Sequence, residues 1–118
     1  MIKKINLSMT TIDHLRALAF SFPETTEEPH FEKTSFRVKK KIFVTHDGNK
    51  NIATIKLSEA DQDIFSADIS IYPVPNKWGK QGWTILEMGQ IHPDLFTDAV
   101  TTAYCEVAPP KLAQLIRP

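Results

Sequence analysis

Two short stretches of this chain concentrate basic side chains, and the second also carries an indole. The residues concerned are Arg37, Lys39, Lys40, Lys41, Lys77, Trp78 and Lys80. Lysine and arginine beside strands can contact phosphates, and an exposed tryptophan can stack on a sugar or a base. Lysines in a turn also have a purely structural use, because their charge keeps strand edges from pairing with other chains. The spacing alone leaves both interpretations open.

The single cysteine, Cys105, is a candidate nucleophile, but its expected surroundings do not suit catalysis. On a helix of about 100° per residue it falls opposite the apolar face, on one stripe with Asp94 and Asp98. Neighbouring carboxylates disfavour the thiolate, whereas reactive cysteines need positive surroundings. We therefore expect a plain surface thiol.

Metal and phosphate-loop chemistry lack a recognisable pattern. The histidines are His14, His30, His46 and His92. None of them is paired with another at the spacing of metal ligands. Gly79 and Gly82 are too close together for a phosphate loop and lack its strand–loop–helix context. We expect a non-catalytic protein without cofactor or metal.

Size and composition are those of one globular domain. The chain has 118 residues, of which 42% are hydrophobic and 24% charged. This predicts a single domain over residues 1–118, with its folded core at about 10–112. A formal net charge of zero means that any nucleic-acid role must rest on local clusters of basic residues.

The chain carries no signal for secretion or membrane insertion. With one cysteine it cannot form an intrachain disulfide, which suits a reducing compartment. Its first residues lack the continuous apolar segment of a secretory signal, and no apolar run reaches the length of about 18 residues that spans a bilayer. We expect a cytoplasmic protein without a membrane partner.

Apolar residues at spacings of three and four predict helices over residues 10–22, 58–65 and 93–107. Thr10 and Asp13 form a pattern typical of a capping box at the first helix. Pro93 suits the first position of the last helix, where its missing N–H is not needed.

Alternating apolar residues predict five strands, at about 35–38, 41–45, 53–57, 69–71 and 83–88. The order α-β-β-β-α-β-β-α favours an α+β fold, an antiparallel sheet of about five strands with packed helices. Lys39 and Lys40 must turn between the first two strands. Two-residue hairpins usually contain Asn or Gly, because their central residues need positive φ. We expect this turn to be strained or longer than two residues.

The remaining segments are expected to be irregular. They are a tail at residues 1–9, a polar connector at 24–30, a loop at 76–81 and a loose tail over the last eight residues. Trp83 follows the loop within a strand, so we assign it to the core. Burying such an aromatic contributes on the order of a few kcal/mol.

Several of these segments together resemble one known family. They are Ser35-Phe-Arg-Val38, Lys41-Ile-Phe43, Ala53-Thr-Ile-Lys-Leu57, Trp78-Gly-Lys-Gln-Gly-Trp83, Ala103-Tyr104 and Val107-Ala-Pro109-Pro-Lys-Leu112. In this order they resemble the MmcQ/YjbR family over about residues 10–112. The resemblance implies a fold similar to the secretion-chaperone-like and CyaY-like folds, and DNA binding through a double-wing arrangement.

By this resemblance, Arg37, Lys39, Lys40 and Lys41 would contact backbone phosphates of duplex DNA from one wing. Lys77 and Lys80 would do so from the other wing, with Trp78 stacking or packing beside them. Such binding would tolerate many sequences, because phosphate contacts do not read bases. Family members usually have a glycine where this chain has Lys40, so the tip of the first wing gains charge and loses flexibility.

Two other functions remain as alternatives. In the first, the chain is a protein-interaction or chaperone-like domain whose exposed apolar patch around Trp78 binds a protein partner. The zero net charge and the resemblance to secretion-chaperone folds favour it. In the second, the chain binds a small molecule or acts as an enzyme, for which no motif is present. The sequence leaves the oligomeric state open.

Overall fold

Six antiparallel strands form one sheet, in the order β1-β2-β3-β4-β6-β5, within residues 10–118, the part of the chain that this computed structural model describes. The strands are β1 (Thr25–His30), β2 (Lys33–Val38), β3 (Lys41–Asp47), β4 (Ile52–Lys56), β5 (Ile71–Pro73) and β6 (Trp83–Glu87). The helices are α1 (Ile12–Phe20), α2 (Glu59–Phe65), α3 (Lys77–Lys80), α4 (Pro93–Val107) and α5 (Pro110–Ile116). The α+β class and the antiparallel sheet are as the sequence predicts, with one strand more than expected.

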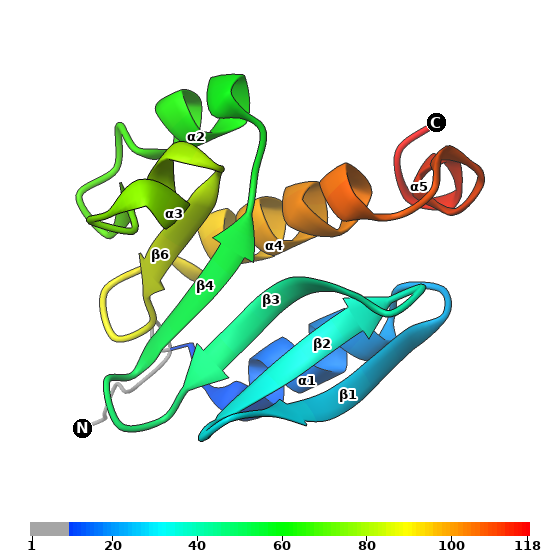
Figure 1. Ribbon diagram of the computed structural model, residues 1–118, viewed down its shortest axis with the longest axis horizontal. Coiled ribbons are helices and arrows are strands. Elements are labelled where there is room, and N and C mark those ends of the chain that lie inside the picture. The colour runs from blue at the N-terminus through cyan, green and yellow to red at the C-terminus, as the bar shows by residue number, and fades with distance from the viewer. Residues whose placement is uncertain (1–9) are drawn as a thin grey trace, which may run out of the picture.

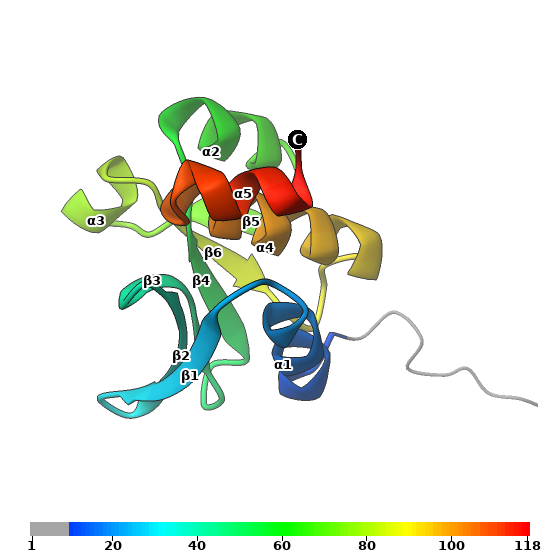
Figure 2. The ribbon, with the colours of Figure 1, turned by 90° about the vertical axis from the view of Figure 1, so that its right-hand side faces the viewer.

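Helices α1 and α4 cover one face of the sheet and leave the other face open (Figure 1). The long helix α4 packs against β3 and β4, and α1 lies against β1. Figure 2 shows α3 on the opposite side of the sheet from α1 and α4. The sheet therefore has a core face and an open face, and α3 belongs to the open one.

Alternation along β6 shows how the two faces are built. Thr84, Leu86 and Met88 are fully buried against the helices, while their neighbours in the strand point the other way. On the helix side, the Tyr104 ring stacks on Phe22, with ring centroids 4.7 Å apart. Its hydroxyl donates to the carbonyl oxygen of Pro23 at 2.8 Å. This contact fastens α4 to the segment between α1 and β1.

Strand β1 replaces the polar connector that the sequence predicts for residues 24–30. It pairs with β2 along its whole length, from Thr25 opposite Val38 to His30 opposite Lys33. Backbone pairing needs no apolar alternation, and an edge strand exposes much of its surface to water. The prediction was wrong because it relied on an apolar pattern that this edge strand does not have.

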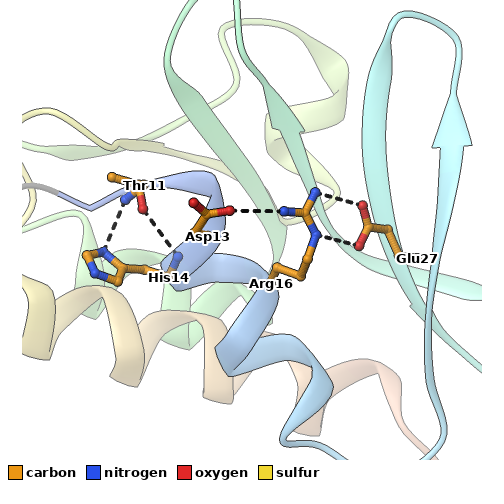
Figure 3. Close-up of polar contacts among 5 residues, drawn as sticks. All are labelled: Thr11, Asp13, His14, Arg16 and Glu27. Atoms are coloured by element: carbon orange, nitrogen blue, oxygen red, sulfur yellow. Dashed lines mark hydrogen bonds and ion pairs between the residues drawn. The ribbon is translucent and has the colours of Figure 1, made fainter.

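An ion pair holds β1 to the first helix (Figure 3). The Arg16 guanidinium donates to both carboxylate oxygens of Glu27, with Nε to Oε1 at 2.8 Å and Nη2 to Oε2 at 3.0 Å. Arg16 also donates to Asp13 one turn earlier in α1. The hydrogen bond from Arg16 lowers the pKa of the Glu27 carboxyl. Glu27 thus faces the helix layer rather than the open face.

The cap of α1 lies one residue later than predicted. Thr11 is the N-cap, and it forms a reciprocal capping box with His14, each side chain accepting from the other residue's backbone N–H at 3.3 Å (Figure 3). Thr10 is buried, and its N–H donates to the carbonyl oxygen of Met88. The tertiary contact to Met88 therefore takes Thr10 away from the capping role assigned to it.

Two short helices occupy segments predicted to be irregular. The single turn α3 forms within the expected loop at residues 76–81, because the Asn76 side chain accepts from the backbone N–H of Trp78 at 2.8 Å. Helix α5 replaces the expected loose tail. Its Pro110 occupies the first turn, and its buried Leu112 belongs to the hydrophobic core beside α4.

The tail expected at residues 1–9 lies outside the described residues. Within residues 10–118, no helix is both long enough and apolar enough to cross a membrane.

Candidate nucleic-acid interface

The open face of the sheet carries rows of side chains that the strand pairing aligns. Residues directly opposite one another in antiparallel strands lie on the same face. One such row runs from Thr45 through Thr54 and Ile85 to Tyr72. Neighbouring rows on this face are formed by Asp47, Ile52 and Glu87, and by Lys56 and Trp83. The open face therefore mixes hydroxyls, isoleucines and aromatic rings.

A groove of about 860 Å³ crosses this face. Its lining residues come from the β1–β2 hairpin, the central strands and α3. They are His30, Lys33, Ile42, Thr45, Lys50, Ile52, Thr54, Tyr72, Val74, Pro75, Asn76, Trp78, Trp83, Ile85 and Glu87. We call this hollow the sheet groove. It connects the tip of one hairpin to the one-turn helix on the far side of the sheet.

Two glycines place both tryptophans in the sheet groove. A Cβ at Gly79 would lie 2.0 Å from the carbonyl oxygen of Val74, so α3 approaches that backbone more closely than any side chain permits. A Cβ at Gly82 would lie 2.0 Å from the carbonyl oxygen of Leu57, and Gly82 has φ of +103°. Because only glycine tolerates both constraints, these residues fix how α3 meets β6.

A buried amide locks the same connection from α2. The Nε2 atom of Gln62 donates to the Gly79 carbonyl at 2.9 Å and to the Thr84 hydroxyl at 3.0 Å. Gln62 is buried, as is Thr84. A buried amide with satisfied hydrogen bonds holds its partners in one arrangement. The position of Trp78 therefore does not depend on a loose loop.

Aromatic side chains are partly exposed in the sheet groove. Trp78 is 49% exposed and Tyr72 37% exposed. The Tyr72 hydroxyl donates to the Glu87 carboxylate, and this bond raises the pKa of the phenol. Trp83 is half-buried against its neighbours. The groove thus offers indole faces beside polar groups.

Lysines flank the sheet groove at both ends. Lys33 and Lys50 line the end beside the hairpin tips, where His30 joins them. At the other end, the ammonium of Lys77 lies 5.7 Å from the centre of the Trp78 ring. Among the described residues, neither Lys33 nor Lys50 forms an ion pair with an acidic side chain. Their charges are free for a ligand.

The predicted cluster around the β2–β3 turn lies outside the sheet groove and is partly engaged. Arg37 donates to the Ser35 hydroxyl at 3.0 Å and to the Pro29 carbonyl at 3.4 Å. Lys39 forms an ion pair with Glu24 at 2.7 Å. Lys40 and Lys41 are exposed. Of the basic residues predicted there, the last two have the most accessible charges.

The β2–β3 turn contains only two residues, and both are strained. Lys39 has φ of +51° and Lys40 has φ of +69°. These values place both residues in the left-handed region, which residues other than glycine, asparagine and aspartate seldom occupy. The sequence predicts either a strained turn or a longer one, and the turn is short and strained.

The two predicted wings do not lie side by side. Figure 1 places the β2–β3 turn at the right of the sheet and α3 at the upper left. Strand β3 pairs with β4 only from Val44 to Asp47, so its first residues pair with β2 alone. Trp78 therefore lines the sheet groove with Lys77 beside its ring, and Lys80 is on the same one-turn helix, whereas Lys39, Lys40 and Lys41 lie outside the groove.

The assignment of Trp83 to the core was wrong. Trp83 lies on the open face, because the alternation of β6 turns Thr84 and Leu86 toward the helices. The same alternation could have indicated this, since Trp83, Ile85 and Glu87 occupy the positions between the buried residues. Tyr72, Lys33 and Lys50 also line the groove, although no local pattern in the sequence predicts that they share it.

The comparisons with known proteins identify the family. The family model described as YjbR matches residues 20–106. This chain belongs to the YjbR family. The match includes all six strands and the whole segment from Trp78 to Trp83.

One solved structure supports the fold of this YjbR-family chain. It is the crystal structure of protein DR2400 from Deinococcus radiodurans, described as a DUF419 domain. The two structures superpose with a TM-score of 0.72 at 20% sequence identity, over 84% of this chain and 79% of that one. At this identity the similarity concerns the fold alone. No curated protein matches the chain.

The thiol of this YjbR-family chain is more covered than expected. Cys105 is partly buried and packs against the core, in a cavity of about 420 Å³ between α2, α4 and α5. The thiol was expected at the surface, and it is partly covered because the end of α5 lies beside it at Arg117. Burial raises the pKa of the thiol, although the nearby Arg117 opposes the shift. A raised pKa disfavours the nucleophilic thiolate.

Proposed function

We propose that this YjbR-family chain is a non-catalytic DNA-binding protein whose lysines contact backbone phosphates. The carrying observation is that most basic residues gather on the strands, their turns and α3, although the formal net charge is zero. Every lysine and arginine between residues 33 and 80 lies on a strand, in a turn between strands or in α3. Helices α2 and α4 contain acidic residues and neither lysine nor arginine.

This distribution of basic residues supports binding of an anion at the sheet and α3. The acidic residues of the two helices are Glu59, Asp61, Asp63, Asp94, Asp98 and Glu106. None of these six lines the sheet groove, where Glu87 is the acidic residue, and Asp61, Asp98 and Glu106 line the cavity beside Cys105. Because screening limits interactions between exposed charges to about 10 Å at ordinary salt, the acidic side does not cancel the field of the basic one. A polyanion would therefore be attracted to the sheet side.

The test is the salt dependence of duplex binding. We expect affinity for a mixed-sequence duplex to fall steeply as salt rises, because bound phosphates release counterions. In the triple variant Lys39→Ala, Lys40→Ala and Lys41→Ala, the slope should become shallower by about 2, since each phosphate contact contributes about 0.9 and Glu24 already neutralises Lys39. Lys111→Ala in α5 is the matched control, with an unchanged slope expected. Absence of binding at low salt would overturn the proposal.

A second candidate function, binding of a protein partner, is favoured by the exposed rings of Trp78 and Tyr72. Exposed aromatic residues on an open sheet are typical of interaction surfaces. Pull-down from a lysate with and without nuclease separates the two functions. Partners lost on nuclease treatment support nucleic-acid binding, whereas partners that survive it support the protein interaction.

A further inference from the structure

The floor of the sheet groove is apolar, which phosphate contacts alone do not explain. Ile42, Ile52 and Ile85 line it together with the indole of Trp83. Ile85 is only 9% exposed, yet it lies outside the hydrophobic core that the helices cover. Apolar surface in an open groove gains free energy when an apolar face covers it. The ligand of this groove should therefore present flat apolar surface as well as negative charge.

Single-stranded nucleic acid combines the flat faces of unpaired bases with the charge of its phosphates, and duplex DNA does not expose those faces. In a duplex the faces of the bases are stacked on one another, so a protein meets phosphates and base edges only. In a single strand the bases can unstack and place their faces on aromatic side chains, while the backbone follows a basic groove. The aromatic and basic residues of the groove therefore favour single-stranded nucleic acid over a duplex.

We propose that the sheet groove binds single-stranded nucleic acid, with bases stacked on Trp78 and Trp83. Lys33 and Lys50 hold phosphates at one end of the groove, and Lys77 and Lys80 hold them at the other. This inference rests on the proposed nucleic-acid binding. It differs in the ligand, which is single-stranded and not duplex, and in the surface that binds it. The lysines of the β2–β3 turn are not part of this site.

Side chains in the middle of the groove can hydrogen-bond to the edges of any base. The hydroxyls of Thr45 and Thr54 lie in the same cross-strand row on the floor. A hydroxyl can donate or accept, so it satisfies the edges of different bases. Stacking likewise tolerates every base, because each has an aromatic face. We expect weak sequence preference.

The stacking surface is rigid before any ligand binds. Asn76 caps the turn that carries Trp78, and Gln62 fixes the Gly79 carbonyl from below. The strand itself holds Trp83 opposite Lys56. A site already held in its bound arrangement loses less conformational entropy on binding.

Intrinsic fluorescence tests the proposal, because the chain has two tryptophans and both line the sheet groove. The probes are an oligothymidylate of about ten nucleotides, the matching oligouridylate, and the duplex of the same oligothymidylate with oligoadenylate. We expect either single strand to quench the tryptophans and to bind about tenfold or more tightly than the duplex. The two single strands show whether the sugar matters.

Variants locate the binding. Trp78→Ala should weaken single-strand binding about tenfold or more, while Trp83→Phe retains a smaller ring and should weaken it less. Lys33→Ala with Lys50→Ala should make the salt slope of single-strand binding shallower by about 1.4, at about 0.7 per phosphate. Lys111→Ala should bind like the unaltered protein. A melting curve for each variant separates loss of the site from loss of the fold.

The outcomes distinguish this inference from the proposed function. If duplex binds as tightly as single strand and only the Lys39, Lys40 and Lys41 variant weakens it, the groove inference is overturned and DNA binding stands. If neither form binds at low salt, both proposals fail. Binding that leaves the fluorescence unchanged, or that Trp78→Ala does not weaken, also overturns the inference. A nuclease-resistant protein partner whose capture Trp78→Ala abolishes would instead assign the groove to a protein.

Discussion

At the scale of single residues, the two lysines of the β2–β3 turn occupy an unfavourable backbone conformation. Lys39 and Lys40 both have positive φ, at +51° and +69°. For a residue with a Cβ this conformation costs roughly 1–2 kcal/mol, whereas glycine adopts it freely. Lys40 therefore exchanges stability for an exposed positive charge at the tip of a hairpin.

We predict that Lys40→Gly raises the free energy of unfolding by about 1 kcal/mol, because it relieves the strain at positive φ. Lys40→Ala is the matched control, since it removes the same charge but keeps a Cβ in the strained position. It should change the stability little. Urea denaturation checks this through the midpoint at an unchanged slope. Equal midpoints for the two variants would contradict the explanation.

At the scale of elements, the contact between α1 and β1 replaces the hydrophobic pattern that β1 lacks. Arg16 of α1 holds the Glu27 carboxylate through two hydrogen bonds. The bidentate geometry is more specific than a single contact between charges. The edge strand is thereby fixed to the helix layer although few of its side chains are buried.

This contact predicts a dependence of stability on pH. The pKa of Glu27 is lower in the folded chain than its ordinary value of 4.5, because Arg16 hydrogen-bonds the ionised form. Its stabilising contribution is therefore complete above about pH 4.5 and is lost as the pH falls through the folded value. Glu27→Gln should be less stable than the unaltered protein near neutral pH, and the difference should vanish in acid.

Urea denaturation at a series of pH values measures that difference. Glu32→Gln is the control, because Glu32 is exposed at the β1–β2 turn and forms no ion pair within the described residues. It should show no comparable difference. A gap between Glu27→Gln and the unaltered protein that stays constant down to strongly acidic pH would contradict the role of the ionised carboxylate.

At the scale of the whole molecule, a net charge of zero conceals an uneven distribution of charge. Within residues 10–118, lysines flank the sheet groove, which contains one acidic residue, Glu87, whereas α2 and α4 carry acidic residues and neither lysine nor arginine. A charged surface interacts mainly with the protein charges closest to it, because salt screens its interaction with more distant charges. The net charge alone therefore does not describe how this chain meets other charged molecules.

We predict that the protein is retained by both cation and anion exchangers near pH 7 at low salt, although its formal net charge is zero. Lys33→Ala with Lys50→Ala should elute earlier from the cation exchanger, because these charges are concentrated at one end of the groove. Lys111→Ala with Arg117→Ala removes the same formal charge from α5 and its C-cap and should shift elution less. Equal shifts for the two double variants would show that net charge, and not its placement, controls retention.

Local sequence determined those parts of the protein that depend on nearby residues. The apolar spacing predicted α1, α2 and α4 to within a few residues, and alternation predicted β2, β3, β4 and β6. The strand expected at 69–71 was misplaced, because β5 begins at Ile71 and continues to Pro73 by pairing with β6. The strain at Lys39 and Lys40 also followed from the sequence, because turn geometry depends on the residues in the turn. The quoted segments were sufficient to assign the family, which the match to residues 20–106 confirms.

Tertiary structure alone decided which face each functional side chain occupies and which of them meet. Strand pairing brings Lys33, Lys50 and Trp78 to one groove, and no local spacing links these residues. The same pairing turns Trp83 away from the core, because the helices cover only one face of the sheet. Edge strand β1 forms for the same reason, since its backbone partners lie in β2. Contacts between distant segments, and not residue type, fix these positions.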